Sequence, residues 1–295
     1  MGIKRKATTG YIVIMIILFL LVLMCLIPLL NTLAISFSDK VSAQNGNVFV
    51  WPVNFTVNPY REILKDTQFF ISFLISVRRV IVGSIINIFL AVLTAYPLSK
   101  SPAHFRSKNR YMWFVVAMML FPPGLIPSYI LVSKLGMINT IWALVVPGAL
   151  PIFATIMLMN SYKQVPASLE EAALIDGAGP VYILTRIFIP LSKATIAVVA
   201  LWQIVYHWND FFLGMIYMTK KELYPLQTYI QSLTVSINWQ DVNNMKGEDI
   251  ARMLSVSNLT FNSAKVVISL IPILIVYPFL QRYFVTGIVM GAVKE

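Results

Sequence analysis

The sequence predicts an all-α polytopic membrane protein, and three observations lead to that fold class. Hydrophobic residues make up 58% of the 295 residues and charged residues only 12%, whereas soluble domains carry about 45–50% and about 25%. The mean hydropathy of +0.76 is more than a soluble fold of this size could keep from water. The apolar residues also gather in runs of about 20, the length that a helix needs to cross a bilayer. We count six such transmembrane runs and expect a single transmembrane domain over residues 1–295.

The first predicted span covers residues 11–33 and follows three basic residues at positions 4–6. A cleaved signal peptide is the alternative interpretation. The apolar part of a signal peptide is only about 7–15 residues long and ends at a cleavage site with small residues. The longer run here favours a helix that stays in the membrane.

The second predicted span covers residues 80–98. Arg78 and Arg79 separate it from a further apolar run at residues 69–77. A charge at the middle of a membrane costs at least about 2.5–3.5 kcal/mol. We therefore expect this arginine pair at the membrane edge.

The other four predicted spans contain prolines or polar residues within their apolar runs. They cover residues 112–132, 138–159, 194–218 and 266–284. Prolines interrupt three of these spans, at Pro122, Pro123, Pro127, Pro147, Pro151, Pro272 and Pro278. Each proline removes a helical hydrogen bond and bends the helix, which suits a protein with an internal path, although proline is also common in membrane helices generally.

An even number of spans places both termini on the same side of the membrane. The short loop at residues 99–111 holds four basic residues and no acidic one: Lys100, Arg106, Lys108 and Arg110. Short basic loops stay in the cytoplasm, so we predict an N-in, C-in topology. Loop 160–193, called the coupling loop below, is then cytoplasmic, and the long loops 34–77 and 219–265 are extracellular. The net charge of +11 fits this topology, and we expect no nucleic-acid partner.

The sequence lacks the common signatures of enzymes and metal sites. No Gly-Lys pair occurs, so no P-loop can hold ATP. HExxH, CxxC and Gly-x-Ser-x-Gly are also absent, and Cys25 is the only cysteine. We therefore expect no catalytic residue, no metal ligand and no cofactor bound by this chain.

The coupling loop is polar at its start and has helical propensity. Ser168 followed by Glu171 resembles a capping box, which predicts a helix that starts near Ser168. Gly177 and the Gly179–Pro180 pair are expected to end it, and a second short helix is expected over residues 181–189. A solvated amphipathic loop is the alternative.

Motifs in this loop and beyond it resemble those of a known transporter family. The run Glu171-Ala172-Ala173, two residues, Asp176-Gly177-Ala178, then Ile187 and Pro190 resembles the coupling motif of permease subunits in bacterial ABC importers. Residues 95–100, 124–127 and 208–210 are similar to carbohydrate-uptake permeases related to the maltose system. Residues 224–227 and 277–295 look more like the branch that takes up oligosaccharides or polysaccharides.

This resemblance implies a type I ABC importer permease fold in the bacterial cytoplasmic membrane. It implies a heterodimer with a homologous second permease, two ATPase subunits that bind ATP and Mg, and an extracellular solute-binding (lipo)protein that delivers a carbohydrate. The residues that it assigns to ATPase coupling are Glu170, Glu171, Ala172, Ala173, Asp176, Gly177 and Pro190. The chain would be a non-catalytic subunit of that complex.

Candidates for the substrate path come from the chemistry of sugar recognition, in which aromatic faces and polar side chains act together. Trp208, Asn209 and Asp210 combine both, and an acid at membrane depth is by default a functional hypothesis; hydrogen bonds to neighbouring helices are the structural alternative. Tyr129 is a further candidate. Arg78 and Arg79 would contact lipid headgroups, the binding protein or an acidic ligand.

Two other functions were considered. A secondary transporter subunit would show an inverted repeat or a buried chain of charges for ion coupling, and neither is evident. A membrane assembly protein without transport activity would not explain the spacing in the coupling loop.

Overall fold

The computed structural model describes residues 9–102, 104–235 and 258–292, and every regular element within them is helical. The prediction of an all-α fold is confirmed over these residues. They divide into two compact units, one from residues 9–67 with 232–235 and 258–271 and the other from residues 68–102, 104–231 and 272–292. Each unit is described by itself.

The first unit begins with α1 (Thr9–Ser36), which contains the predicted span 11–33. Its side chains from Gly10 to Leu30 are exposed and almost all apolar, so the helix is hydrophobic around its whole circumference, as expected for a helix that faces lipid. The apolar surface of α1 ends at Asn31. The side-chain amide of Asn31 donates to the carbonyls of Val48 and Phe49 at 3.1 and 2.6 Å. These bonds attach the following loop to the end of α1.

Two short helices follow in this loop. Asp39 caps α2 (Lys40–Gln44) by accepting from two backbone N–H groups of its first turn. α3 (Asn58–Lys65) follows, and Phe37 stacks on Tyr60 of α3 at a centroid distance of 4.8 Å. The first part of α17 (Asn258–Ala292) completes the unit, where Lys265 Nζ lies 3.8 Å from Asp66 Oδ2. Hydrogen bonds, aromatic stacking and an ion pair thus all contribute contacts in the loop predicted as extracellular.

The second unit is built on α4 (Thr67–Ser99), a helix of 33 residues. It runs without a break through Arg78 and Arg79, so the two apolar runs that the sequence separates form one helix. The buried residues of α4 recur every three or four positions and are mostly small or polar: Ser72, Ser76, Arg79, Gly83, Asn87, Ala91, Ala95 and Leu98. Its exposed positions are mostly apolar, among them Leu74, Ile81, Ile85, Phe89 and Leu93; Arg78 is an exception. Polar groups inside and apolar groups outside are the arrangement that a lipid environment selects.

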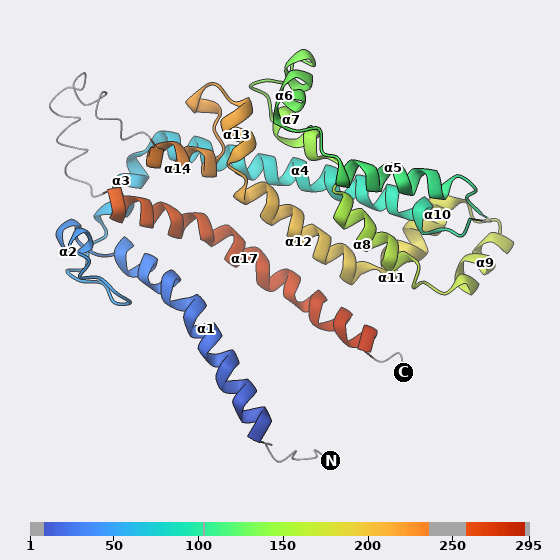
Figure 1. Cartoon of the computed structure of the whole chain (residues 1–295), viewed down its shortest axis with the longest axis horizontal. Helices are drawn as coiled ribbons and strands as arrows, with labels where there is room; N and C mark the ends of the chain where they lie inside the picture. The colour runs from blue at the N-terminus through green and yellow to red at the C-terminus, as the bar shows by residue number, and fades with distance from the viewer. Residues whose placement is uncertain (1–8, 103, 236–257, 293–295) are drawn as a thin grey trace. The chain divides into compact units, whose positions relative to one another are not determined.

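Helices α8 (Ile152–Tyr162) and α12 (Lys193–Asn209) pack with α4 around one core, as Figure 1 shows. Buried alanines such as Ala91 and Ala95 let the helices approach closely. The amide of Asn87 also donates to Gln203 Oε1 at 2.7 Å and joins α4 to α12.

The predicted third and fourth spans are broken where their prolines lie. α5 (Lys108–Leu120) and α6 (Leu125–Lys134) meet at 110° across Pro122 and Pro123, where Gly124 has φ +80°. α7 (Ile141–Val145) with η1 (Val146–Gly148) meets α8 at 49° next to Pro151. The expected proline bends are confirmed in both spans, because no residue there can supply the missing helical hydrogen bonds.

The boundaries of the remaining spans differ from the predicted ones. Predicted span 194–218 is divided: α12 ends at Asn209 and α13 (Phe212–Tyr217) follows after a short extended break. Predicted span 266–284 lies within α17. Among the described residues, α1 and α4 are each long and apolar enough to cross a membrane, and three bent helix pairs bring this number to at most five. The total of six spans stays a prediction.

Candidate coupling and translocation sites

The coupling loop folds into a helix, a turn and a second helical stretch. α9 (Ala167–Ile175) comes first, followed by α10 (Pro180–Ile183), the π-helical turn η2 (Leu184–Phe188) and α11 (Ile189–Leu191). The prediction that a helix starts near Ser168 is confirmed, because α9 starts at Ala167, but the predicted capping box is wrong, because no side chain caps the helix. Pro166, with ψ 130°, holds the chain extended just before the helix, so Ser168 falls inside the first turn.

The end of α9 is where the sequence predicted it. Gly177 has φ +76°, a left-handed conformation that favours glycine. Its N–H donates to Leu174 O at 3.0 Å, and the N–H of Ala178 donates to Ala173 O at 2.9 Å. Asp176 is the last residue before this turn. These bonds satisfy carbonyls that the helix end would otherwise leave free.

α9 lies on the surface of the described chain, with none of its residues buried. Glu171 and Ala172 are exposed, and Ile175 is exposed to 86%. Val181 and Tyr182 of the next helix are exposed as well. An apolar patch in an otherwise polar loop indicates a surface that another protein covers.

Glu170 points to the body of the unit, unlike its neighbour Glu171. Its Oε1 lies 2.5 Å from Lys100 Nζ, one residue beyond the end of α4. The Lys100 ammonium also lies over two aromatic rings, 4.0 Å from the centroid of Tyr96 and 4.1 Å from that of Phe188. Burial lowers the pKa of Lys100 below its usual value, and the hydrogen bond and charge of Glu170 oppose that shift.

A hollow of about 200 Å³ opens beside this ion pair. Its lining includes Glu170, Glu171, Lys100, Lys163 and Tyr162. The predicted coupling residue Pro190 lies elsewhere, on α11, just before an 84° bend that leads into α12. The coupling loop thus reaches α4 through Lys100 and continues directly into α12.

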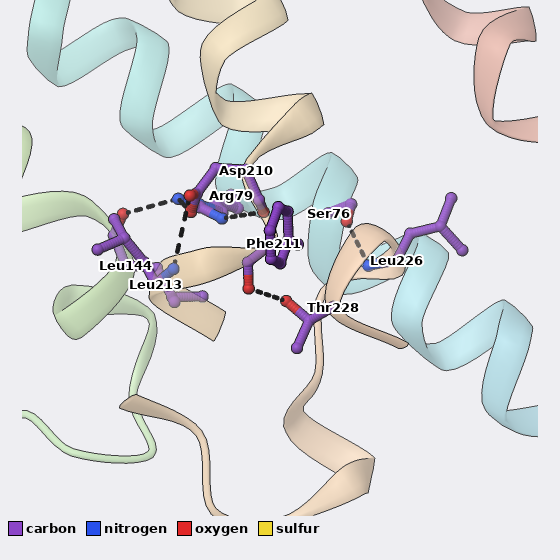
Figure 2. A network of polar contacts seen from close by, with 8 residues as sticks. All are labelled: Ser76, Arg79, Leu144, Asp210, Phe211, Leu213, Leu226 and Thr228. Carbon is purple, nitrogen blue, oxygen red and sulfur yellow. Dashed lines mark hydrogen bonds and ion pairs between the residues drawn. The ribbon is translucent and has the colours of Figure 1, made fainter. Parts of the chain in front are cut away.

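The second site surrounds Arg79, whose side chain is 0% exposed. Its Nη2 lies 2.5 Å from Asp210 Oδ2 and donates to Leu144 O at 3.4 Å. Its Nη1 donates to Asp210 O at 3.0 Å. Figure 2 shows the guanidinium between α4, α7 and the break after α12. Arg79 is thus buried and paired with Asp210, whereas its neighbour Arg78 is exposed; the expectation that the pair lies at the membrane edge stays a prediction.

The break between α12 and α13 is held by side chains from other segments. Asp210 has ψ 116° and cannot continue the helix, and its Oδ1 accepts from Leu213 N of α13 at 3.5 Å. Thr228 Oγ1 donates to Phe211 O at 2.9 Å, as Figure 2 also shows. Side chains thus satisfy backbone groups that the break frees, which is the condition for non-helical backbone inside a membrane protein.

The remaining candidates for the substrate path, Trp208, Asn209 and Tyr129, differ in how far they are buried. Trp208 is buried and meets Phe73 edge to face at 5.6 Å, so its ring packs against α4. Asn209 is exposed. Tyr129 is partly exposed and stacks on Tyr217 at 6.2 Å. The role of each in a substrate path stays a prediction.

Residues that the sequence did not single out join α4 to α12 beside the Arg79 site. Gly83 lies against the ring of His207, and a Cβ at Gly83 would collide with that ring. The pair of Asn87 and Gln203 lies on the same side of α4. A glycine within a long apolar helix is the signal that could have pointed to this close approach.

Comparison with known proteins places the chain in a family. Residues 87–290 match the family described as binding-protein-dependent transport system inner membrane component. The chain belongs to this family. The match includes the coupling loop and one partner of the Arg79 site, Asp210, so both sites lie at least partly in the part of the chain that the family shares.

Individual relatives of this permease cover nearly all of its length. Protein LplC of Bacillus subtilis strain 168 is 34% identical over 91% of this chain and 89% of its own. The polygalacturonan/rhamnogalacturonan transport system permease protein YtcP of the same organism is 32% identical over 94% and 95%. The crystal structure of a bacterial ABC transporter involved in the import of the acidic polysaccharide alginate contains a chain with a TM-score of 0.84, 29% identity and coverage of 96% and 99%. The permease fold that the sequence motifs implied is thereby confirmed.

Proposed function

We propose that this permease is the transmembrane subunit of an ATP-driven ABC importer that takes up an oligosaccharide or polysaccharide fragment. The observation that carries the proposal is the coupling loop: a surface helix with exposed Glu171, a sharp stop at Gly177 and an apolar patch around Ile175. The relatives named above, which include a polysaccharide permease and an alginate importer, support the carbohydrate as substrate.

The coupling loop is the surface to which an ATPase subunit binds, and that subunit holds ATP and Mg. Glu171 is available for this contact, because its side chain is exposed and makes no ion pair among the described contacts. Small residues next to it, such as Ala172, allow a groove wall to approach closely. The permease itself is non-catalytic and holds no cofactor, in keeping with its lack of a P-loop lysine.

The complete importer contains a second, homologous permease. One chain supplies one coupling loop, whereas two ATPase subunits are needed to enclose nucleotide between them. The chain crosses the membrane six times with both termini in the cytoplasm, and a binding (lipo)protein brings the sugar to the outer face. Nucleotide binding then rocks the two permeases between outward-open and inward-open states.

The substrate is an acidic glycan. Polygalacturonan and alginate, which the names of two relatives specify, are both polymers of uronic acids. In this chain the Arg79 guanidinium forms an ion pair with Asp210, so Arg78 is the arginine of the two that could bind an anionic substrate. The path candidates Asn209 and Tyr129 would contact hydroxyl groups and ring faces of the sugar.

The test is reconstitution of the permease in liposomes with the proteins encoded beside it. ATP-dependent uptake of an alginate or galacturonate oligosaccharide, with an ATPase that copurifies with the permease, is the expected result. Uptake that persists without ATP but collapses with the ion gradient would instead establish a secondary transporter. A chain that copurifies with neither an ATPase nor a second permease would overturn the proposal.

A further inference from the structure

Lys100 connects three segments that meet at the end of α4. Its ammonium is bound to Glu170 of α9, and it lies between the rings of Tyr96 from α4 and Phe188 from η2. The two rings pack edge to face with their centroids 5.1 Å apart, and both contact the ammonium group. The side chain is only 13% exposed.

α9 has few other points of attachment. No residue of α9 is buried, and only Ala173 packs partly against the core of the unit. Among the described residues, the bond between Glu170 and Lys100 is the one ion pair that joins α9 to another helix. A helix with so little buried surface gains little from packing, so this ion pair determines where α9 lies relative to α4.

We propose that Lys100 is a positioning residue that locks the ATPase-coupling helix α9 to the end of α4, so that a movement imposed on α9 is transmitted into the membrane part of the chain. The proposal rests on the function proposed above, since it takes the ATPase as the source of that movement. Lys100 itself touches neither ATP nor sugar.

The position of Lys100 at the end of α4 explains how one side chain could transmit the movement of α9. α4 is one helix from Arg79 to Ser99, a length of about 30 Å at 1.5 Å per residue, with Pro97 in its last turn. Displacement of its end by α9 therefore reaches the site where Arg79 holds the break after Asn209. Without the ion pair, the turn around Gly177 and the loop before α9 would absorb the movement.

The experiment measures hydrogen exchange of the assembled transporter in nanodiscs, with and without ATP and vanadate. The variants are Lys100→Met, Glu170→Gln and the conservative Lys100→Arg, which keeps a cation at the Tyr96 and Phe188 rings. Lys163→Met is the matched control, because Lys163 lines the same hollow, is exposed and has no ion pair among the described contacts. Peptides covering residues 167–178 report on α9, and peptides covering residues 94–100 report on the end of α4.

We expect exchange in residues 167–178 to be about tenfold faster in Lys100→Met and Glu170→Gln than in the parent. The nucleotide-dependent change in residues 94–100 should disappear in both variants and persist in Lys100→Arg. The control Lys163→Met should behave as the parent. If Lys100 had only a structural role, its substitution would raise exchange equally with and without nucleotide, and the nucleotide response would remain.

Two outcomes would overturn the proposal: an unchanged nucleotide response of residues 94–100 in Lys100→Met, or loss of that response in Lys100→Arg although the complex assembles. Failure of the proposed function looks different. In that case the parent itself shows no nucleotide response, while exchange in residues 167–178 still shows whether the ion pair holds α9.

Discussion

The buried ion pair at Arg79 predicts an unequal effect of removing its two partners. Breaking a buried pair costs about 3–5 kcal/mol, because the remaining charge is left without compensation. Arg79 is 0% exposed and Asp210 14% exposed, so water can partly solvate the carboxylate that remains but not the guanidinium. We therefore expect Asp210→Ala to cost about 5 kcal/mol of unfolding free energy and Arg79→Met about 3 kcal/mol.

The measurement is unfolding of the full chain in mixed micelles by titration with sodium dodecyl sulfate. Arg78→Met is the matched control, since Arg78 is exposed, and its effect should stay within about 0.5 kcal/mol. The double variant Arg79→Met with Asp210→Leu should recover most of the loss, because an apolar pair of similar volume replaces the ion pair without a stranded charge. If Arg79→Met cost as little as Arg78→Met, or more than Asp210→Ala, the reasoning from solvation would be refuted.

Three further predictions concern coupling, packing and substrate charge. Glu171→Ala should leave folding and ATP hydrolysis in place but reduce sugar uptake at least about tenfold, equivalent to about 1.4 kcal/mol; uptake equal to the parent's in the same vesicles would remove Glu171 from the coupling contact. Gly83→Ala should destabilise the chain by about 1–3 kcal/mol through its clash with His207, whereas Gly10→Ala, which meets no atom within 4 Å, should be neutral in the same titration. Arg78→Gln should lower uptake of a galacturonate oligosaccharide at low salt, and the deficit should shrink at high salt because ions screen exposed charges; a deficit independent of salt would speak against a direct charge contact.

The helical class and the coupling loop could be predicted from the sequence because both depend on local information. Composition and apolar runs reflect the solvent around each helix, and the stop at Gly177 depends only on glycine's tolerance of a positive φ. The start of α9 was also predicted to within one residue, but its capping was not. Ser168 and Glu171 have the right spacing for a capping box, yet Pro166 holds the N-cap position and no side chain caps the helix.

The Arg79 site could not be predicted, because its partner lies 131 residues away along the chain. The penalty for a charge in a membrane applies to an isolated charge, and that assumption placed both arginines at the edge. Asp210 was recognised as a candidate only for its own charge. Lys100 likewise belonged to a recognised motif, but nothing in the motif shows that its ammonium lies between Tyr96 and Phe188.

The separation of Arg79 from Asp210 also has a consequence for biosynthesis. The ribosome adds about 5–20 residues per second, so Asp210 leaves it about 7–26 s after Arg79, given the 131 residues between them. During that interval α4 is an apolar helix with an uncompensated guanidinium, which in the membrane centre costs about 2.5–3.5 kcal/mol on insertion scales. We therefore expect the nascent helix to settle first with its arginines toward the interface, and Arg79 to reach its buried position only when α12 arrives with the carboxylate. Insertion would then end with a late adjustment of a helix that is among the first to enter the membrane.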